Sequence, residues 1–140
     1  RLRFGGEEAV LVASTPARYT EGGFANHHYV QAPPSAHSLC CEAEVPGADG
    51  ALERAGFIAF GLVGPRTPGW PLSAAAGPGR LFDFVEVERV VVAPGWRGRG
   101  VLELLLSVAG LYHAQGLPCR IRTASERVHR LLLRARDFVA

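Results

Sequence analysis

The residues best suited to chemistry are the glycines and arginines of one short stretch, Arg97-Gly98-Arg99-Gly100. A valine run precedes this stretch and a leucine-rich segment follows it. Glycine lets a backbone approach an anion closely, and the free N–H groups at the start of a helix point toward such an anion. This order predicts a strand, a phosphate-binding loop and a helix, with a diphosphate-bearing cofactor as the ligand.

Three kinds of phosphate-binding loop differ in the spacing of their residues. A P-loop has a lysine after its second glycine, and this chain contains no lysine. A dinucleotide-binding loop has a third glycine or alanine at the position where this chain has Glu103. A third pattern has Arg or Gln, two variable residues, Gly, a variable residue, and Gly or Ala. The chain fits it from Arg97 onward at every place but the last, which is Leu102.

The third pattern is the signature of the GNAT N-acetyltransferase superfamily, which the chain resembles most specifically over residues 85–102. The resemblance implies an α/β (α+β) fold with a mixed, mostly antiparallel central sheet flanked by helices. It also implies an enzyme that passes the acetyl group of acetyl-CoA directly to an amine acceptor. The acceptor, a small molecule or a protein, is not identified by the sequence, because the residues that select it lie in variable loops.

The resemblance also indicates which residues would hold acetyl-CoA. In the family, a bulge at the end of the fourth strand turns backbone N–H groups toward the acetyl and pantetheine groups, and here these belong to Val90, Val91 and Val92. The diphosphate contacts would fall to Arg97, Gly98, Arg99, Gly100, Val101 and Leu102. Because Leu102 is bulkier than the family's glycine or alanine, it would shift or weaken the contact between the helix start and the phosphates.

A general base must take a proton from the acceptor amine before or during acetyl transfer. Glu86 lies eleven residues before Arg97, the spacing at which histone-acetyltransferase-like members of the family place this base. Glu88 is the competing candidate, and an ordered water is the family's other solution. Either glutamate could instead face solvent or pair with an arginine. The tyrosine that often serves as general acid in the family's last helix corresponds here to Leu133.

Two histidines and a tyrosine are candidates for the acceptor site, namely His27, His28 and Tyr29. They lie where the family's first helices line the acceptor cleft, although a plain helix end is an equal interpretation. The histidines, acids and three cysteines show no spacing typical of a metal site or of a disulfide framework, so we expect no metal and a reducing, intracellular compartment.

Apolar runs and turn residues predict the elements that would position these groups. We expect strands over residues 9–13, 38–45, 55–63, 80–92 and 119–123, of which the second and third form a hairpin. Helices are expected over 17–24, 101–114 and 126–135, and a surface loop over 64–79. The family's closing two-strand hairpin has no counterpart, and the chain does not begin with methionine. We therefore expect residues 1–140 to be one domain and a fragment of a longer protein.

Two other functions stay open at this point. Leu102, Leu133 and the absent hairpin favour a catalytically degenerate module that binds a cofactor or a protein. The arginine-rich segment after residue 119 favours an RNA-binding domain, although it lacks the interleaved aromatic residues typical of one. The net charge of +2 indicates no general attraction to nucleic acid, and no apolar run is long enough to span a membrane.

Overall fold

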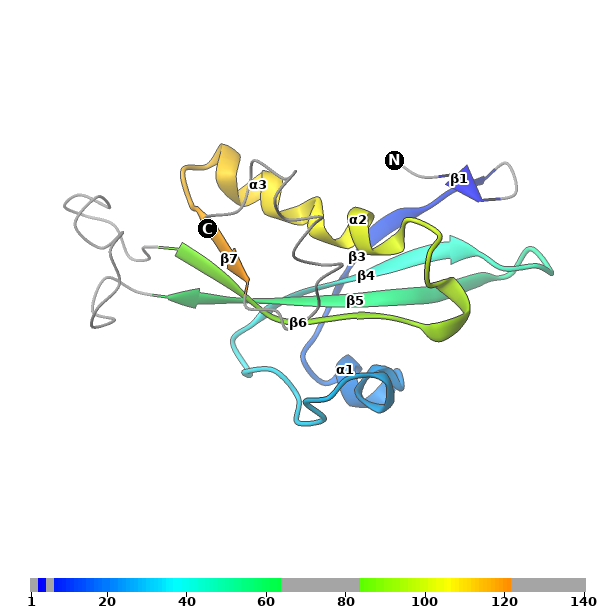
Figure 1. Ribbon diagram of the computed structural model, residues 1–140, viewed down its shortest axis with the longest axis horizontal. Coiled ribbons are helices and arrows are strands. Elements are labelled where there is room, and N and C mark those ends of the chain that lie inside the picture. The colour runs from blue at the N-terminus through cyan, green and yellow to red at the C-terminus, as the bar shows by residue number, and fades with distance from the viewer. Residues whose placement is uncertain (1–2, 5–6, 64–83, 122–140) are drawn as a thin grey trace.

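A computed structural model of the chain describes residues 3–4, 7–63 and 84–121. Its centre is a five-stranded sheet in the order β3-β4-β5-β6-β7 (Figure 1). The strands β3 to β6 are antiparallel to one another in succession, and β7 is parallel to β6. The strands are β3 (Val10–Ser14), β4 (Leu39–Pro46), β5 (Leu52–Val63), β6 (Phe84–Val92) and β7 (Cys119–Ile121). The mixed, mostly antiparallel sheet predicted from the sequence is confirmed.

The predicted hairpin is the pair β4 and β5, which are joined by a tight turn. The Gly47 N–H donates to the Ala51 carbonyl at 2.7 Å, and the Asp49 carboxylate accepts from the Ala51 N–H at 3.0 Å. Because pairing continues up to Pro46 opposite Leu52, β5 begins three residues earlier than its apolar run indicated. The resulting 12-residue strand extends across the molecule.

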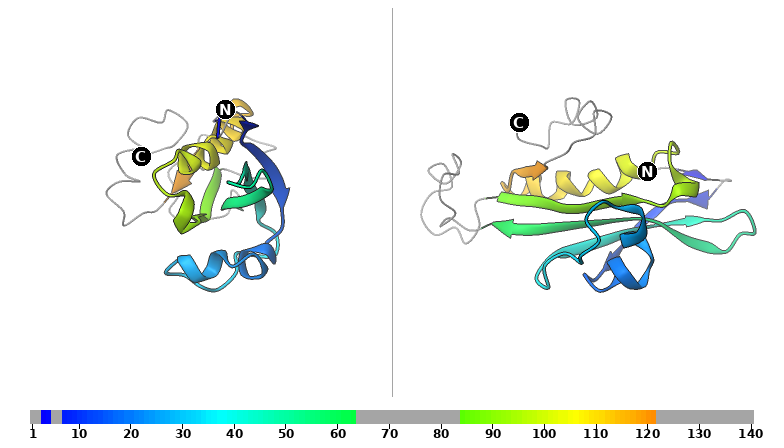
Figure 2. Two further views of the ribbon diagram at one scale, coloured as in Figure 1. Left: turned by 90° about the vertical axis from the view of Figure 1, so that its right-hand side faces the viewer. Right: turned by 60° about the horizontal axis from the view of Figure 1, so that its bottom comes forward.

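The helices α2 (Val101–Leu106) and α3 (Val108–Ala114) cover one face of the sheet (Figures 1 and 2). The sequence predicted a single helix over 101–114, but Ser107 separates the two. Its hydroxyl hydrogen-bonds to the Leu104 carbonyl, and its own carbonyl accepts from Gly110 at 3.0 Å in a three-residue turn. A serine that bonds back to its own helix competes with the regular pattern, which accounts for the interruption.

The opposite face is covered by α1 (Arg18–Glu21) and the 3₁₀ turn η1 (Phe24–His27). The predicted helix over 17–24 is therefore wrong in its extent. Gly23 has φ of 79°, in the left-handed region, and this ends the helical path. A two-stranded pair that the sequence did not predict precedes β3 and consists of β1 (Arg3–Phe4) and β2 (Glu7–Glu8). The predictions for residues 64–83 and 122–140, including Leu133, lie outside the described residues.

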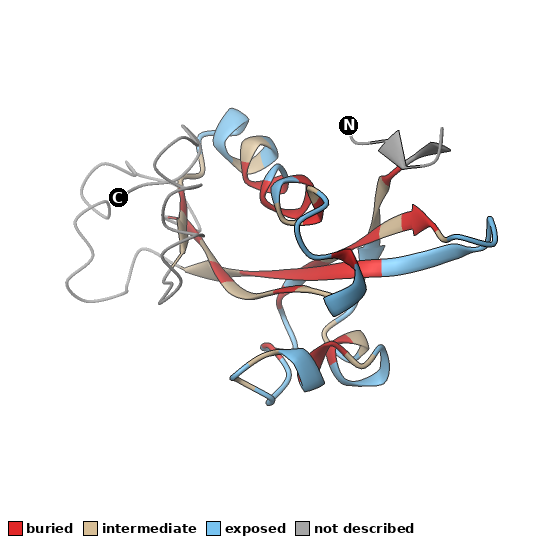
Figure 3. Cartoon of the chain, turned by 45° about the vertical axis from the view of Figure 1, so that its right-hand side comes forward, coloured by how far each residue is buried: buried red, intermediate tan, exposed pale blue. Residues whose placement is uncertain are grey.

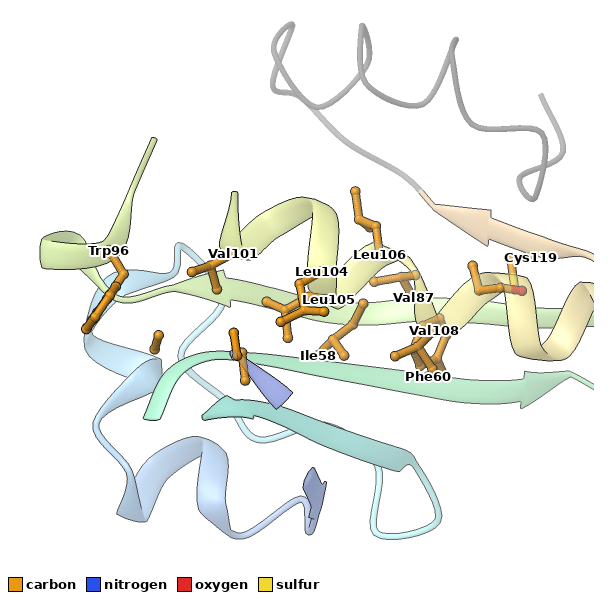
Figure 4. Packing of buried hydrophobic residues seen from close by; sticks show 14 of the residues in the cluster. Ile58, Phe60, Val87, Trp96, Val101, Leu104, Leu105, Leu106, Val108 and Cys119 are labelled. Carbon is orange, nitrogen blue, oxygen red and sulfur yellow. The ribbon is translucent and has the colours of Figure 1, made fainter. Parts of the chain in front are cut away.

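Two apolar cores lie on the two faces of the sheet, and the buried residues of both run along its middle strands (Figure 3). The larger core is formed under α2 and α3 by Ile58 and Phe60 of β5 with Leu104, Leu105 and other residues of those helices (Figure 4). The smaller core lies under α1 and η1 and contains Tyr19, Phe24, Ala25, Cys40, Phe57, Ala59 and Val91. Burial on both faces explains the nearly continuous apolar run of β5.

Strand β6 contains a β-bulge at Glu88. The register against β5 passes from Val87 directly to Arg89, so Glu88 is an extra residue. Such a residue reverses the alternation of side chains along a strand. As a result Val87 and Val90 both pack toward α2 and α3. Simple alternation along β6 would place Val90 on the same face as Glu86 and Glu88, whereas the bulge moves Val90 to the opposite face.

Candidate functional site

The glycine-rich loop follows β6 and joins it to α2. It begins with a 3₁₀ turn, η3 (Pro94–Trp96), and continues through Gly98 and Gly100, whose φ angles are 74° and 87°. Both angles lie in the left-handed region that glycine adopts without strain. Gly100 is the N-cap residue directly before α2, and no side chain of the described residues caps that end. The first N–H groups of α2 are therefore without a partner inside the helix, as at any helix start.

A groove opens between the end of β6, this loop and the first turn of α2. Most of the residues predicted to hold acetyl-CoA line it, together with two that the sequence analysis did not select for that role. The lining residues are Val90, Val92, Trp96, Arg97, Gly98, Gly100, Leu102 and Glu103. Leu102 faces this groove, where the family pattern has glycine or alanine. The bulge at Glu88 is what turns Val90 and Val92 toward the groove.

Three of the predicted cofactor residues lie outside the groove lining. Val91 is buried in the core under α1, on the other face of the sheet. Val101 is buried in the larger core (Figure 4). Arg99 is exposed at the surface of the loop, with its guanidinium carbon 4.6 Å from the centre of the Trp96 ring. Only the backbone of Val91 and Val101 is therefore available to a ligand in the groove.

Trp96 was missed as a site residue by the sequence analysis. Its side chain is 9% exposed, packs against the larger core and lines the groove. Its indole Nε1–H donates to the Glu53 carboxylate at 3.0 Å, which connects the loop to the β4–β5 hairpin. A tryptophan inside a glycine- and arginine-rich loop was the available signal, because so large a side chain needs a place in the core.

The two candidate bases lie on β6 outside the groove lining. Glu86 is half-buried and lies opposite Gly61 of β5 and Arg120 of β7. Glu88 is half-buried at the bulge, and its Oε2 accepts a hydrogen bond from the Ser35 N–H at 3.0 Å. Glu88 therefore faces the segment that connects η1 to β4, on the side of the sheet away from α2.

The connecting segment also carries the candidate acceptor residues. Tyr29 is 85% exposed, and its ring stacks on His28 with centroids 4.6 Å apart. Burial lowers the pKa of His28. A hydrogen bond with the Val30 backbone opposes this effect, and the positive charge of Arg89 adds to it. His27 is exposed at the end of η1. The structure thus brings His28 and Tyr29 together in one stacked pair and leaves His27 apart from it.

Arg89 fastens this segment to the strand next to the bulge. Its guanidinium donates to the Ala32 carbonyl from Nε at 3.2 Å and from Nη2 at 3.1 Å. The same group lies 5.7 Å from the centre of the Tyr19 ring. Together with the bond between Glu88 and Ser35, these contacts hold residues 32–35 against β6.

A buried carboxylate, Glu42 on β4, was also missed. It is 1% exposed and accepts hydrogen bonds from Ser14 and from Arg18 of α1, and it forms an ion pair with Arg54 at 3.2 Å. Burial alone raises the pKa of a carboxyl group, but the bonds from Arg18 and Ser14 and the nearby arginine charges hold the pKa of Glu42 below its ordinary value. This cluster attaches α1 to the sheet.

The described residues contain no group of three His, Cys, Asp or Glu side chains that could hold a metal ion. The three cysteines all lie in the described part of the chain and form no disulfide, and burial raises the pKa of Cys40 to about 11. Tyr112 packs on Phe60 with ring centroids 5.1 Å apart, and burial raises its pKa too. Among the helices of the described part, none is both long and apolar enough to cross a membrane.

No family model matches the chain, and no curated protein matches it by sequence. Several solved structures, however, are similar to it in fold. An acetyltransferase of Trypanosoma brucei superimposes with a TM-score of 0.59 at 17% identity, covering 95% of this chain and 94% of that chain. The aminoglycoside N-acetyltransferase AAC(6')-Iy, in complex with a bisubstrate analogue of CoA, gives a TM-score of 0.58 at 16% identity, with 96% and 92% covered.

A ribosomal-protein-alanine N-acetyltransferase from Brucella melitensis gives a TM-score of 0.57 at 16% identity, with 96% of this chain and 93% of that chain covered. At such low identity these similarities establish the fold. The chain therefore has the fold of these acetyltransferases, which confirms the GNAT-like fold that its sequence predicted.

Proposed function

We propose that this chain transfers an acetyl group from acetyl-CoA directly to an amine. The observation that carries the proposal is the groove, because it gathers Val90, Val92, Arg97, Gly98, Gly100 and Leu102, all of which the sequence predicted to hold the cofactor. The similarity to acetyltransferases crystallised with CoA or a CoA analogue supports the same choice of cofactor.

The diphosphate of CoA would bind at the loop end of the groove. The N–H groups of Val101 and Leu102 are without acceptors inside α2, and the glycines at 98 and 100 bring no side chain between them and a phosphate. Arg97 supplies a positive charge in the groove, which offsets the carboxylate of Glu103 on the same lining. Leu102 narrows the groove relative to the glycine or alanine of the family pattern.

The reaction itself forms a C–N bond and breaks a C–S bond. The neutral amine attacks the thioester carbonyl, the CoA thiolate leaves, and a base takes the proton that the amine loses. Glu86 and Glu88 are the proposed bases. Neither lines the groove that would hold the diphosphate, which is consistent with a base that acts on the acceptor at the bulge in β6.

Binding of acetyl-CoA to the purified chain, measured by calorimetry, tests the first step. We expect Gly100→Val to abolish binding, because a branched side chain at φ of 87° distorts the loop and blocks approach to the backbone. Gly95→Val is the matched control, because a Cβ at this glycine of the same loop meets no atom within 4 Å. Wild-type affinity in Gly100→Val would refute the assignment of the loop.

Release of free CoA that depends on an added amine tests the second step. A panel of aminoglycosides and peptides with an N-terminal alanine represents the acceptors named for two of the similar acetyltransferases. The alternative function, a domain that binds the cofactor without turnover, is favoured by Leu102 in the groove. Amine-dependent release of CoA would exclude it, whereas tight binding without release by any acceptor in the panel would support it.

The choice between the two bases has its own test. If Glu86 is the base, Glu86→Gln lowers the rate and removes the acidic limb of its pH profile with little change in acetyl-CoA affinity. Glu88→Gln should then leave that limb in place. The reverse result would assign the role to Glu88, and unchanged profiles in both would indicate water.

The RNA-binding alternative stays a prediction, because most of its arginines lie outside the described residues.

A further inference from the structure

The glycine-rich loop is held from outside by the β4–β5 hairpin. The contact is the hydrogen bond from the Trp96 Nε1–H to Oε2 of Glu53, 3.0 Å long. The two residues are 43 positions apart in the chain, so this bond joins two separate elements. Trp96 lines the groove, whereas Glu53 is exposed on β5 and lies outside the groove lining.

The hairpin is shaped to accommodate this carboxylate. A Cβ added at Gly47 would lie 2.5 Å from the Oε1 atom of Glu53, closer than such atoms approach in proteins. Gly47 faces Glu53 across the turn and leaves room for its carboxylate. The absence of a side chain at 47 therefore lets the carboxylate of Glu53 occupy this position and accept from the indole.

The indole in turn supports a cation of the loop. The guanidinium carbon of Arg99 lies 4.6 Å from the centre of the Trp96 ring, within the range of a cation–π contact. A change in the orientation of the indole would displace both the groove wall and Arg99. The indole has a single hydrogen-bond donor, so the position of the Glu53 carboxylate that accepts from it restricts the orientation of the ring.

We propose that Glu53 and Trp96 are positioning residues for coenzyme binding. The hydrogen bond between them fixes the indole, and the indole fixes one wall of the groove and the Arg99 side chain. The hairpin turn thus acts on the coenzyme site without touching the coenzyme. This role rests on the function proposed above, because the ligand is the acetyl-CoA assigned to that groove.

The test is the Kd of CoA, measured by calorimetry at a temperature where circular dichroism shows every variant folded. Trp96→Phe keeps an aromatic face for Arg99 and removes the donor, and Glu53→Leu removes the acceptor. Each variant should weaken CoA binding about fivefold to tenfold, because this is the usual net contribution of one hydrogen bond expressed as a ratio of Kd values. The double variant should bind no more weakly than either single variant, because both lose the same bond.

Two further variants separate positioning from general damage. Glu53→Gln keeps a carbonyl acceptor of the same length and should bind CoA within about twofold of the wild type. Glu44→Leu removes another glutamate of the hairpin, which pairs with Arg54 Nε at 3.2 Å, and should leave the Kd unchanged.

Results that differ from these expectations would overturn either the positioning role or the proposed function. Wild-type affinity in Glu53→Leu and Trp96→Phe overturns the positioning role and leaves the proposed function intact. Additive losses in the double variant, or a Gln variant as weak as the Leu variant, also overturn it, because the hydrogen bond would then not be the cause. Absence of CoA binding in the wild type overturns the proposed function, and the positioning role with it.

Discussion

Gly98 and Gly95 lie in the same loop, and both have open space around them, but their backbone conformations differ. A Cβ added at either would meet no atom within 4 Å, but only Gly98 has a positive φ, 74°. Alanine at 98 must adopt the left-handed region, which costs about 1 kcal/mol, whereas alanine at 95 adopts an ordinary conformation. We expect Gly98→Ala to lower the free energy of unfolding by about 1 kcal/mol relative to Gly95→Ala, measured by urea denaturation.

Equal stabilities of these two variants would contradict the left-handed geometry of the loop. A cost much larger than that of one strained residue would point to a steric clash, which the open space around Gly98 does not allow.

Glu42 gives a prediction about pH. Its pKa is lowered in the folded chain, mainly because the hydrogen bonds from Arg18 and Ser14 outweigh burial. A group of this kind stabilises the fold above its ordinary pKa of about 4.5, and the stabilisation is lost as the pH falls through the folded value. We expect Glu42→Gln to destabilise the chain by about 3 kcal/mol at pH 7, because Arg18 and Arg54 lose their buried partner.

The measurement is the unfolding free energy of the wild type and of Glu42→Gln between pH 7 and pH 3. The difference between them should shrink below about pH 4.5, the ordinary carboxyl value. Glu21→Gln is the control, because it removes an exposed carboxylate from α1, the helix that contains Arg18, and should have little effect. A difference that stays constant with pH would mean that the charge of Glu42 is not what stabilises α1 on the sheet.

At the scale of elements, the sequence predicted what depends on local pattern. The apolar runs located all five strands of the sheet, and the turn residues of 46–50 identified the hairpin of β4 and β5. The loop between β6 and α2 followed from its glycines. The strand pair β1 and β2 escaped prediction because each strand has only two residues, too few to show a period.

The features that the sequence did not predict depend on contacts between distant residues. The bulge at Glu88 exists only relative to the register of β5, so alternation within β6 alone could not show it. The partners of Glu42 come from β3, α1 and β5, and the bond between Trp96 and Glu53 joins a loop to a hairpin. Six residues of the groove were predicted because one continuous motif carries most of the site.

The bulge also links two elements, which gives a prediction about β6 and the segment after η1. The Ser35 N–H donates to the Glu88 carboxylate, and this is a contact between positions 53 residues apart. We expect Glu88→Ala to speed hydrogen exchange of the Ser35 amide, because that N–H loses its acceptor. Glu103→Ala, which removes an exposed glutamate of α2, should leave the exchange unchanged. NMR of the two variants measures the rates.

Unchanged exchange at Ser35 in Glu88→Ala would mean that the two Arg89 bonds to Ala32 hold the segment without help. Arg89→Ala would then be the variant that releases it.

At the scale of the whole molecule, the groove proposed to hold the coenzyme lies where separate parts of the fold meet. The turn of the β4–β5 hairpin, the loop after β6 and the first turn of α2 gather at the same end of the sheet (Figure 1). Val101, at the start of α2, packs in the larger core next to the groove (Figure 4). A ligand in the groove therefore contacts residues whose arrangement exists only in the folded chain.

Because the unfolded chain has no such groove, CoA should stabilise the fold by mass action. At a free concentration one hundred times its Kd, the gain is about 2.7 kcal/mol, which corresponds to a rise in Tm of roughly 8 °C for a domain of this size. Differential scanning fluorimetry over a series of CoA concentrations measures it, with Gly100→Val as the variant expected to show no rise. Equal rises in both proteins would place the bound CoA outside the groove. A rise in the wild type alone, growing with the logarithm of CoA concentration, is the result that binding in the groove requires.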